Sequence, residues 1–329
     1  MKKILFPLLL FLTGLSLRAQ DLISEQRAVQ LMGSRFELIA IAQDPLLALE
    51  AIEAGIAEIH RIEQLISSWD SLSQTSAINQ QAGIASVIVD RELFQLIYRA
   101  KKVSALTWGA FDISYAAMDN IWKFDGSMKK MPPVDSISKA ASKINWQHIL
   151  LDEKESSVFL KEKGMKIGFG AIGKGYAANR AMMVMKEKNI LGGLVNAGGD
   201  LIAWGASTNA EGWAIKIADP KNKTQPIAWL NIKDMAIVTS GDYERFFTLD
   251  GKRYAHIIDP RTGYPVEGLK SVSVLCPDAE LADALATAVF VLGKEEGLRL
   301  INQLTGVECL LITDQDQLIP SKNLKLNYF

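Results

Sequence analysis

Apolar residues recur at helical spacing along residues 45–67, directly after a strand-like stretch at residues 35–42. Isoleucines three or four positions apart would bury one face of a long helix: Ile52, Ile56, Ile59, Ile62 and Ile66. Asp44 and Pro45 suit the start of this helix, because an aspartate side chain caps free backbone N–H groups and proline is tolerated in the first turn. A second amphipathic pattern, at residues 92–106, predicts another helix.

The second half of the chain is richer in short strand patterns. The predicted strands are residues 148–151, 157–160, 214–217, 227–232, 236–238, 246–249, 254–258, 272–275 and 307–312. Polar residues at 71–83 and 125–145 are expected to form external connections, and further helices are predicted at 279–292 and from 295. Helices and strands mix without a regular βαβ alternation, so we predict an α+β fold with a single compact domain over residues 21–329.

The N-terminus has the pattern of a secretory signal peptide over residues 1–20, with two lysines, a short apolar run and a small residue near the end. Leu15 stands where a bacterial lipoprotein would carry its acylated cysteine, so a soluble, exported, periplasmic protein is expected. The net charge is −1, and removal of Lys2, Lys3 and Arg18 would leave −4. With no basic run, nothing in the sequence indicates nucleic-acid binding.

Two cysteines, Cys276 and Cys309, lie in apolar, strand-like stretches. They could pair in an oxidising compartment, but a free cysteine is often a small core residue, and we expect them to be unpaired. The chain has only three histidines and no cluster of cysteine and histidine, so a zinc site is not expected.

The stretch at residues 166–176 combines four glycines with Lys174 and precedes an alanine-rich helix. Glycines let backbone N–H groups approach an anion, and a helix N-terminus adds partial positive charge, so this arrangement suits phosphate. A glycine-rich turn from a strand to a helix, with a solvated lysine, is the simpler interpretation. Both interpretations remain open for this stretch alone.

Two known nucleotide patterns match this stretch incompletely. A dinucleotide-binding GxGxxG is formed by Gly168, Gly170 and Gly173. The acid expected at the end of the next strand comes late, however, as Asp200 behind two glycines, which weakens a nicotinamide-binding interpretation. A P-loop is also disfavoured, because Gly175 replaces the Ser or Thr that would bind Mg²⁺.

Three later stretches carry residues with chemical potential. Residues 239–246 place Ser240 and Gly241 in a small polar turn after an apolar strand. His256 is the only histidine of the C-terminal half and could be a general base or a structural residue of its strand. Asp283 and Thr287 stand at i and i+4 on an alanine-rich helix, so they share a face; hard oxygen atoms of this kind suit Mg²⁺. An exposed polar helix face is the alternative.

Taken together, these stretches resemble the ApbE family, the FAD:protein FMN transferases. The resemblance covers nearly the whole chain after residue 31. Its motifs are Met32-Gly33-Ser34, Ser73-x-x-Ser76-x-Ile78-Asn79, Thr107-x-Gly109-Ala110-Phe111-Asp112, Gly170-Ala171-Ile172-Gly173-Lys174-Gly175, Asn196-x-Gly198-Gly199-Asp200, Thr239-Ser240-Gly241-Asp242-Tyr243, His256-x-x-Asp259-Pro260-x-Thr262-Gly263 and Asp283-Ala284-x-x-Thr287. The resemblance implies an α+β fold of T-fold type, FAD in a deep cleft, Mg²⁺ at the pyrophosphate, and transfer of FMN to a Thr or Ser hydroxyl with release of AMP.

Residue roles follow from the resemblance by position. It implies Mg²⁺ ligands in the carbonyl of Ala171 and the side chains of Asp283 and Thr287, a pyrophosphate contact in Lys174, and His256 near the reacting phosphate. His256 or Asp283 is the candidate base. Further expected FAD contacts are Met32, Trp69, Gly109, Ala110, Phe111, Asp112, Ser240 and Gly241. Two positions depart from the family pattern, since Gly168 and Asn179 stand where aspartate is usual or frequent.

A Mg²⁺-dependent flavin transferase acting on an exported or membrane acceptor protein is therefore the leading hypothesis. FAD pyrophosphatase activity, giving FMN and AMP, needs only water in place of the acceptor hydroxyl and stays open. A non-catalytic flavin-binding protein is a third possibility, but it could have lost Asp283, Thr287 or His256, and all three are present. The acceptor protein, the number of Mg²⁺ ions and the oligomeric state are left open.

Overall fold

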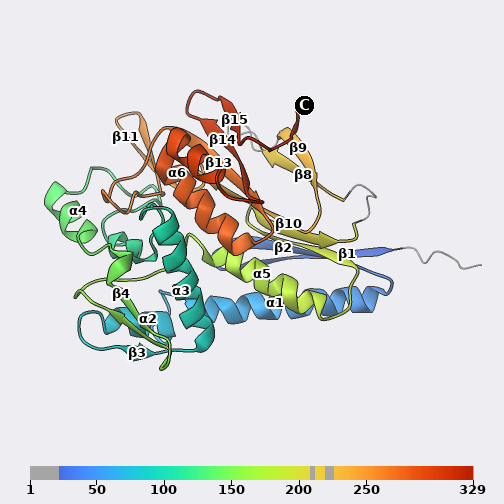
Figure 1. Cartoon of the computed structure of the whole chain (residues 1–329), viewed down its shortest axis with the longest axis horizontal. Coiled ribbons are helices and arrows are strands. Elements are labelled where there is room, and N and C mark those ends of the chain that lie inside the picture. The colour runs from blue at the N-terminus through green and yellow to red at the C-terminus, as the bar shows by residue number, and fades with distance from the viewer. Residues whose placement is uncertain (1–21, 208–211, 219–225, 329) are drawn as a thin grey trace, which may run out of the picture.

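The computed structural model describes residues 22–207, 212–218 and 226–328. The predicted signal peptide lies outside the described residues. The described part is one compact α+β structure in which helices and sheets form layers (Figure 1). None of the described helices is both long enough and apolar enough to cross a membrane.

An eight-stranded sheet is the central layer, and every neighbouring pair of its strands is antiparallel. In spatial order its strands are β1 (Ile23–Leu31), β2 (Ser34–Ala42), β6 (Gly192–Ala197), β7 (Asp200–Gly205), β10 (Met235–Gly241), β13 (Leu269–Cys276), β14 (Glu308–Thr313) and β15 (Leu318–Pro320). The edge strand β1 was not predicted, because most of its residues are polar and none of its side chains is buried. Cys276 and Cys309 lie buried and unpaired in β13 and β14, as expected.

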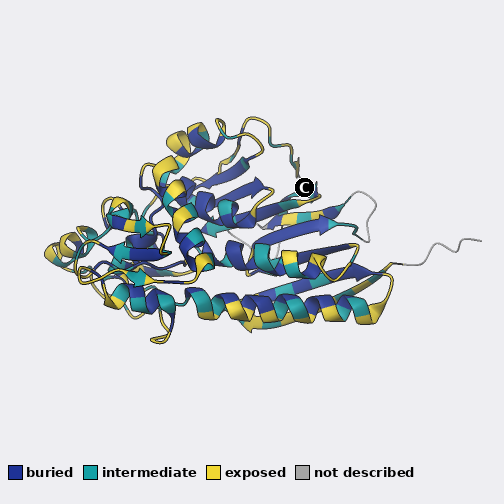
Figure 2. Cartoon of the chain, turned by 60° about the horizontal axis from the view of Figure 1, so that its bottom comes forward, coloured by how far each residue is buried: buried dark blue, intermediate teal, exposed yellow. Residues whose placement is uncertain are grey.

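Three long helices cover one face of this sheet: α1 (Pro45–Ile66), α5 (Gly173–Lys186) and α6 (Ala279–Ile301). The main hydrophobic core lies between them and the sheet (Figure 2). Asp44 caps α1 as predicted, since its Oδ1 accepts a hydrogen bond from Leu46 N at 2.8 Å. Four of the five isoleucines of the α1 pattern are buried, and Ile56 is half-buried. The two predicted C-terminal helices form α6 with a kink at Gly293, where φ is 77°.

A small second sheet covers part of the opposite face. It consists of β16 (Asn327–Tyr328), β9 (Pro226–Ile232) and β8 (Trp213–Ala218) in that spatial order. Trp213 and Leu230 of this sheet form a second core with residues of the central sheet, including Ile41 and Ile237. The central sheet is therefore covered with apolar residues on both faces, which explains the near-continuous burial of β7 and β13.

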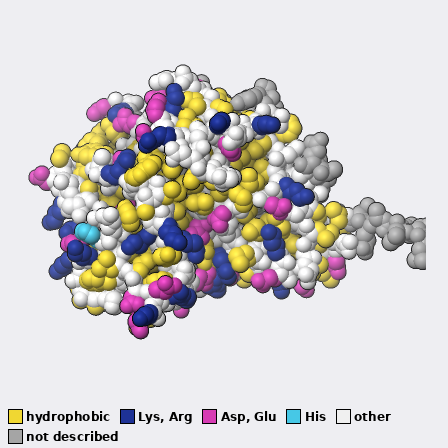
Figure 3. Space-filling view, viewed as in Figure 1, with side chains coloured by type: hydrophobic (Ala, Val, Ile, Leu, Met, Phe, Trp, Pro, Cys, Tyr) yellow, Lys and Arg dark blue, Asp and Glu magenta, His cyan; other side chains and the backbone are white. Residues whose placement is uncertain are grey.

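The remaining elements form the end of the molecule where the cleft lies. They are α2 (Gln74–Gln80), β3 (Val87–Ile88), α3 (Arg91–Leu106), the 3₁₀ helix η1 (Ile113–Met118), α4 (Val134–Ala141), the 3₁₀ helix η2 (Trp146–His148), β4 (Ile149–Asp152), β5 (Ser157–Leu160), and the hairpin of β11 (Phe246–Leu249) and β12 (Lys252–Ala255). Strands β3, β5 and β4 pair in a sheet of their own. On the face shown in Figure 3, acidic and basic side chains are interspersed.

Four expectations about local structure are wrong. Ser240 and Gly241 were expected in a polar turn, but both belong to strand β10, where they pair with Val272 and Ser271 of β13. The predicted polar connection at 71–83 contains α2, because Ser73 Oγ accepts a hydrogen bond from Ser76 N at 3.0 Å and Ile78 is buried. The connection at 125–145 contains α4, which buries Ile137. No strand immediately precedes the glycine-rich turn; instead, Asn79 holds the backbone there through two hydrogen bonds with Ile167.

Candidate active site

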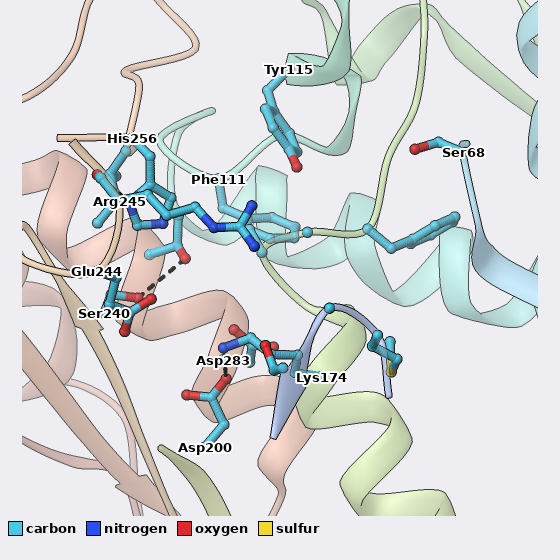
Figure 4. A pocket seen from close by; sticks show the side chains of 18 of the residues that line it. Ser68, Phe111, Tyr115, Lys174, Asp200, Ser240, Glu244, Arg245, His256 and Asp283 are labelled. Atoms are coloured by element: carbon cyan, nitrogen blue, oxygen red, sulfur yellow. Dashed lines mark hydrogen bonds and ion pairs between the residues drawn. The ribbon is translucent and has the colours of Figure 1, made fainter. Parts of the chain in front are cut away.

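A cleft of about 610 Å³ opens between the helical layer and the end of the molecule that carries the β11–β12 hairpin. Its walls come from the β1–β2 turn, the end of α1, residues 110–115, the glycine-rich turn, β7, β10, residues 244–260 and α6. Segments more than two hundred residues apart in the sequence thus meet around one space (Figure 4).

Close packing explains much of the glycine content of the central stretch. A Cβ on Gly170 would lie 2.4 Å from the Tyr115 hydroxyl, and one on Gly173 would lie 2.8 Å from Ile66. A Cβ on Gly175 would lie 2.1 Å from the carbonyl oxygen of Ala279 in α6. At Gly170 and Gly173 a side chain would force the Tyr115 or Ile66 side chain to shift, whereas at Gly175 it would collide with the backbone of α6. Gly175 therefore allows α5 to pack closely against α6. The glycines of this turn thus serve helix packing, independently of any anion.

Lys174 extends from the first turn of α5 into the cleft and forms an ion pair with Asp200 (Figure 4). Asp200 begins β7 and is only 1% exposed. Burial lowers the pKa of Lys174, but the charges of Asp200 and Asp283 more than offset this effect and raise it overall. Lys174 is therefore charged and already neutralised by a carboxylate before any ligand binds.

Asp283 lies on the first half of α6, is 4% exposed and points into the cleft. Its Oδ2 accepts a hydrogen bond from Gly175 N at 2.9 Å. Burial raises the pKa of Asp283, and the neighbouring charge of Asp200 adds to the increase. One turn later, Thr287 also lines the cleft, with its hydroxyl 3.4 Å from the Ser240 hydroxyl.

This environment fits a hard cation. Among the residues that the structure describes, two buried carboxylates, Asp200 and Asp283, have one ammonium group, Lys174, as a close countercharge. The Thr287 hydroxyl and the backbone of Ala171 line the same cleft, so the predicted donor set consists entirely of oxygen atoms, as Mg²⁺ prefers. Within the described residues, no three His, Cys, Asp or Glu side chains cluster as a metal centre. The predicted set contains one carboxylate and does not require such a cluster.

His256 follows β12 and faces Lys174 and Asp283 across the cleft (Figure 4). Its Nδ1 lies 3.2 Å from the carbonyl oxygen of Arg245. Because a carbonyl can only accept a hydrogen bond, Nδ1 carries the proton and Nε2 keeps its lone pair. Burial lowers the pKa of His256 to about 4, and the charges of Arg245 and Lys174 contribute. The imidazole is therefore neutral at pH 7.

Comparison with known proteins decides the family. The sequence profile of the ApbE family matches residues 32–311. The chain belongs to the ApbE family. It is 33% identical over 300 residues to an FAD:protein FMN transferase of Klebsiella pneumoniae, a match that covers 91% of this chain and 92% of that protein. It is 34% identical over 277 residues to an FAD:protein FMN transferase of Treponema pallidum, covering 80% of this chain and 76% of that protein.

Solved ApbE structures share the fold. The crystal structure of an ApbE protein from Thermotoga maritima superposes with a TM-score of 0.84 at 31% identity, covering 91% of this chain and 97% of that one. The apo flavinyl transferase ApbE of Pseudomonas stutzeri superposes with a TM-score of 0.78 at 26% identity, with coverages of 91% and 94%. The α+β, single-domain ApbE architecture predicted from the sequence is thus confirmed.

Most residues singled out by the ApbE resemblance come together. The predicted residues that line the cleft are Met32, Trp69, Ala110, Phe111, Asp112, Ala171, Lys174, Ser240, His256, Asp283 and Thr287. Gly109 and Gly241 do not line it. Gly109, with φ of 78°, ends α3 by donating its N–H to the carbonyl of Ser104, which directs the following residues into the cleft. Gly241 is buried against the ring of Tyr243.

Two of the predicted FAD contacts differ in whether their side chains are already bonded within the protein. The Asp112 carboxylate accepts hydrogen bonds from Ser114 N at 2.8 Å and from Trp146 N at 2.8 Å, so it fixes the wall of the cleft. Trp69, by contrast, is 84% exposed just after the end of α1, which leaves its indole ring available to a ligand at the cleft edge.

The two departures from the ApbE pattern have structural explanations. A Cβ on Gly168 would lie 3.1 Å from Ala116, which leaves little room for the usual aspartate. The Asn179 amide donates to Asp278 Oδ1 at 3.0 Å and accepts from Ala279 N at 3.0 Å. Asparagine can do both, whereas an ionised aspartate cannot donate. Asn179 therefore joins α5 to the N-terminus of α6.

Several cleft residues were not predicted. Asp200 was noted in the sequence as a late acid after the glycine-rich turn and as the last residue of an ApbE motif, but no role was assigned to it. Its pairing with Lys174 depends on how β7 packs under α5. Glu63 accepts a hydrogen bond from Met32 N at 2.8 Å and holds the β1–β2 turn at the cleft. Tyr115 and Arg245 also line the cleft. Arg245 lies within the stretch 239–246, which the sequence analysis singled out without assigning a role to Arg245.

Proposed function

We propose that this protein transfers the FMN part of FAD to a Ser or Thr hydroxyl of an acceptor protein and releases AMP. The observation that carries the proposal is the convergence of Lys174, His256 and Asp283 on one cleft in an ApbE-family chain. The Klebsiella and Treponema relatives, both named FAD:protein FMN transferase, support this activity.

The reaction exchanges one phosphorus–oxygen bond for another. The acceptor oxygen bonds to the phosphorus on the flavin side while the anhydride bond to the AMP side breaks, and the bonding electron pair leaves with AMP. His256 Nε2 takes the proton of the acceptor hydroxyl, since Nδ1 is held by the Arg245 carbonyl and the ring is neutral. A neutral imidazole can accept this proton as negative charge leaves the attacking oxygen.

Asp283, Thr287 and the Ala171 carbonyl would hold Mg²⁺. When bound there, Mg²⁺ neutralises charge on the substrate phosphates. Lys174 adds a fixed positive charge on the same side of the cleft, with Asp200 holding its ammonium in place. The apolar walls, Met32 and Phe111, exclude water beside the flavin, and Trp69 can stack against an aromatic ring at the cleft edge.

An exported site of action accompanies this proposal. It is supported by the signal-peptide pattern of residues 1–20, with a basic start and a short apolar core. We therefore expect the acceptor to be an exported or membrane protein. N-terminal sequencing of protein recovered from the periplasm should begin near residue 21, and recovery of the full-length chain from the cytoplasm alone would contradict the proposal.

The test of the activity is incubation of the protein with FAD and Mg²⁺, with and without a mixture of exported proteins as acceptors. The expected result is AMP release together with an acceptor whose mass has increased by FMN less water, located on Ser or Thr by mass spectrometry. Equal amounts of AMP and free FMN regardless of acceptor would identify a pyrophosphatase instead. FAD binding without AMP release would identify a flavin carrier.

A further inference from the structure

Of the two described positively charged side chains that line the cleft, one is paired with a carboxylate and the other is not. Among the described residues, Lys174 and Arg245 are the only lysine or arginine that line it. Lys174 is paired with Asp200. The guanidinium of Arg245 forms no hydrogen bond or ion pair with the described part of the chain, and the residue is exposed to the cleft. An arginine with no protein partner in a ligand cleft is available to an anion.

The backbone places this guanidinium beside the candidate base. Arg245 directly precedes β11, and its carbonyl oxygen accepts from both His256 N at 3.0 Å and His256 Nδ1 at 3.2 Å. Figure 4 shows the Arg245 side chain extending from the His256 side into the cleft. Its Nη2 reaches to 4.0 Å from the position of a Cβ on Gly33, in the β1–β2 turn. The side chain therefore spans the cleft.

We propose that Arg245 binds the non-bridging oxygens of the phosphate that is transferred with the flavin. This inference rests on the proposed function. A guanidinium is a planar fork of N–H donors that matches two phosphate oxygens at once, and it stays charged at any physiological pH. A base must lie on the side of the attacking hydroxyl, so a cation fixed beside His256 faces the phosphorus that is attacked, whereas AMP leaves on the opposite side.

The charge balance of the cleft supports this role. The attacked phosphate gains negative charge on its oxygens as the new bond to the acceptor forms and the anhydride bond breaks. Lys174 lies between Asp200 and Asp283, so much of its charge is already compensated. Arg245 approaches from the opposite wall of the cleft, and no described side chain compensates its charge. Its guanidinium therefore supplies positive charge to the phosphate that the paired Lys174 cannot supply.

The experiment measures the binding of four ligands by titration calorimetry in Mg²⁺-free buffer: FMN, riboflavin, AMP and adenosine. The variants are Arg245→Gln, Arg245→Lys, and Arg253→Gln as a matched control. Arg253 lies on the same hairpin and pairs with Asp242 at 3.5 Å, and it does not line the cleft. All three changes are on exposed side chains, and thermal unfolding of each variant checks the fold.

Arg245→Gln should weaken FMN binding about 10- to 100-fold, because a charge-assisted contact is lost, and leave riboflavin, AMP and adenosine within about twofold. Arg245→Lys should recover part of the loss, and Arg253→Gln should match the parent. An equal loss for FMN and riboflavin, or a loss confined to AMP, would overturn the assignment, as would unchanged FMN binding. Turnover of FAD by the parent protein tests the proposed function separately, so the two failures are distinguishable.

Discussion

At the scale of single residues, several ionisable side chains are buried close together in the cleft, and burial by itself favours the neutral form of each. Asp283 and Asp200 are buried together with one lysine, and His256 faces that lysine from the opposite wall. Such an arrangement is unfavourable for the empty protein and becomes favourable when charged ligands enter. Perturbed pKa values of this kind are typical of active sites.

Replacement of Asp283 by asparagine should separate stability from function. The amide oxygen of the new side chain can still accept the hydrogen bond from Gly175 N, while the buried negative charge beside Asp200 disappears. Because the raised pKa of Asp283 makes its ionised form costly in the folded state, we expect the empty protein to gain at least about 1 kcal/mol in its free energy of unfolding. We also expect Mg²⁺-dependent turnover to fall at least about 100-fold.

Urea unfolding and an AMP-release assay measure the two effects. The matched control is Asp278→Asn, which alters an exposed carboxylate that caps α6 through Leu281 N. Turnover by the Asp283→Asn variant within about twofold of the parent would exclude Asp283 as a metal ligand.

The protonation of His256 can be followed directly. Because burial disfavours the imidazolium, the folded protein should keep His256 neutral until the pH falls to about 4. The unfolded chain takes up this proton near pH 6.5, so the contribution of His256 makes the folded state less stable as the pH falls from 6.5 to about 4. NMR titration of the ring protons, assigned with a His256→Asn variant, measures the midpoint. A midpoint near 6.5 would contradict the burial argument.

At the scale of elements, the crossing of α5 over α6 determines the geometry of the site. Gly175 gives the two helices their close approach, and Asn179 ties α5 to the first residue of α6. Lys174 and Asp283 lie on these two helices directly at the crossing. The distance between Lys174 and the candidate metal ligand Asp283 is therefore set by helix packing.

Substitution of Gly175 by alanine should disturb this crossing. The new Cβ would lie 2.1 Å from the Ala279 carbonyl oxygen and 2.8 Å from Asp283 Cβ, and neither atom is the end of a flexible side chain. We expect a loss of about 1–3 kcal/mol in the free energy of unfolding, together with weaker Mg²⁺-dependent turnover.

Chemical denaturation provides the measurement, with Gly168→Ala as the control. At Gly168 the nearest atom would be 3.1 Å away, and it is a single methyl group. The prediction fails if the two alanine variants unfold at the same denaturant concentration.

At the scale of the whole molecule, the cleft is a meeting point of the central sheet, the helical layer and the β11–β12 hairpin. No local segment contains the site: its walls run from Met32 to Thr287. A ligand that binds all the walls at once therefore stabilises the folded chain as a unit.

Addition of FAD and Mg²⁺ together should raise the melting temperature by more than the sum of their separate effects. Each ligand reduces the charge that opposes the other, and saturation at about 100 times the dissociation constant contributes about 2.7 kcal/mol. Differential scanning calorimetry with FAD, with Mg²⁺, with both, and with riboflavin plus Mg²⁺ measures the effect. Riboflavin should show no synergy because it lacks phosphate, and purely additive shifts for FAD would argue against a shared phosphate–metal site.

Local patterns in the sequence determined much of the fold. Periodicity alone predicts an element whose pattern depends only on neighbouring residues of the same element. This applies to the helices α1 and α3 and to the apolar strands β10, β13 and β14. The motif residues, from Met32 to Thr287, could likewise be recognised as candidates because their order along the chain matches a family.

Only the tertiary structure decided which of these residues meet and what each one contacts. Lys174 pairs with Asp200, and Trp146 donates to Asp112, across segments that are distant in sequence. The hydrogen bond from Ser114 to Asp112 and the absence of a described partner for the Arg245 guanidinium likewise depend on how the surrounding chain packs. The polar β1 and the short α2 also depend on partners, a neighbouring strand for β1 and a buried face for α2. The physical reason is common to all of them: burial and electrostatic interactions are set by distances in space, which only the packed fold defines.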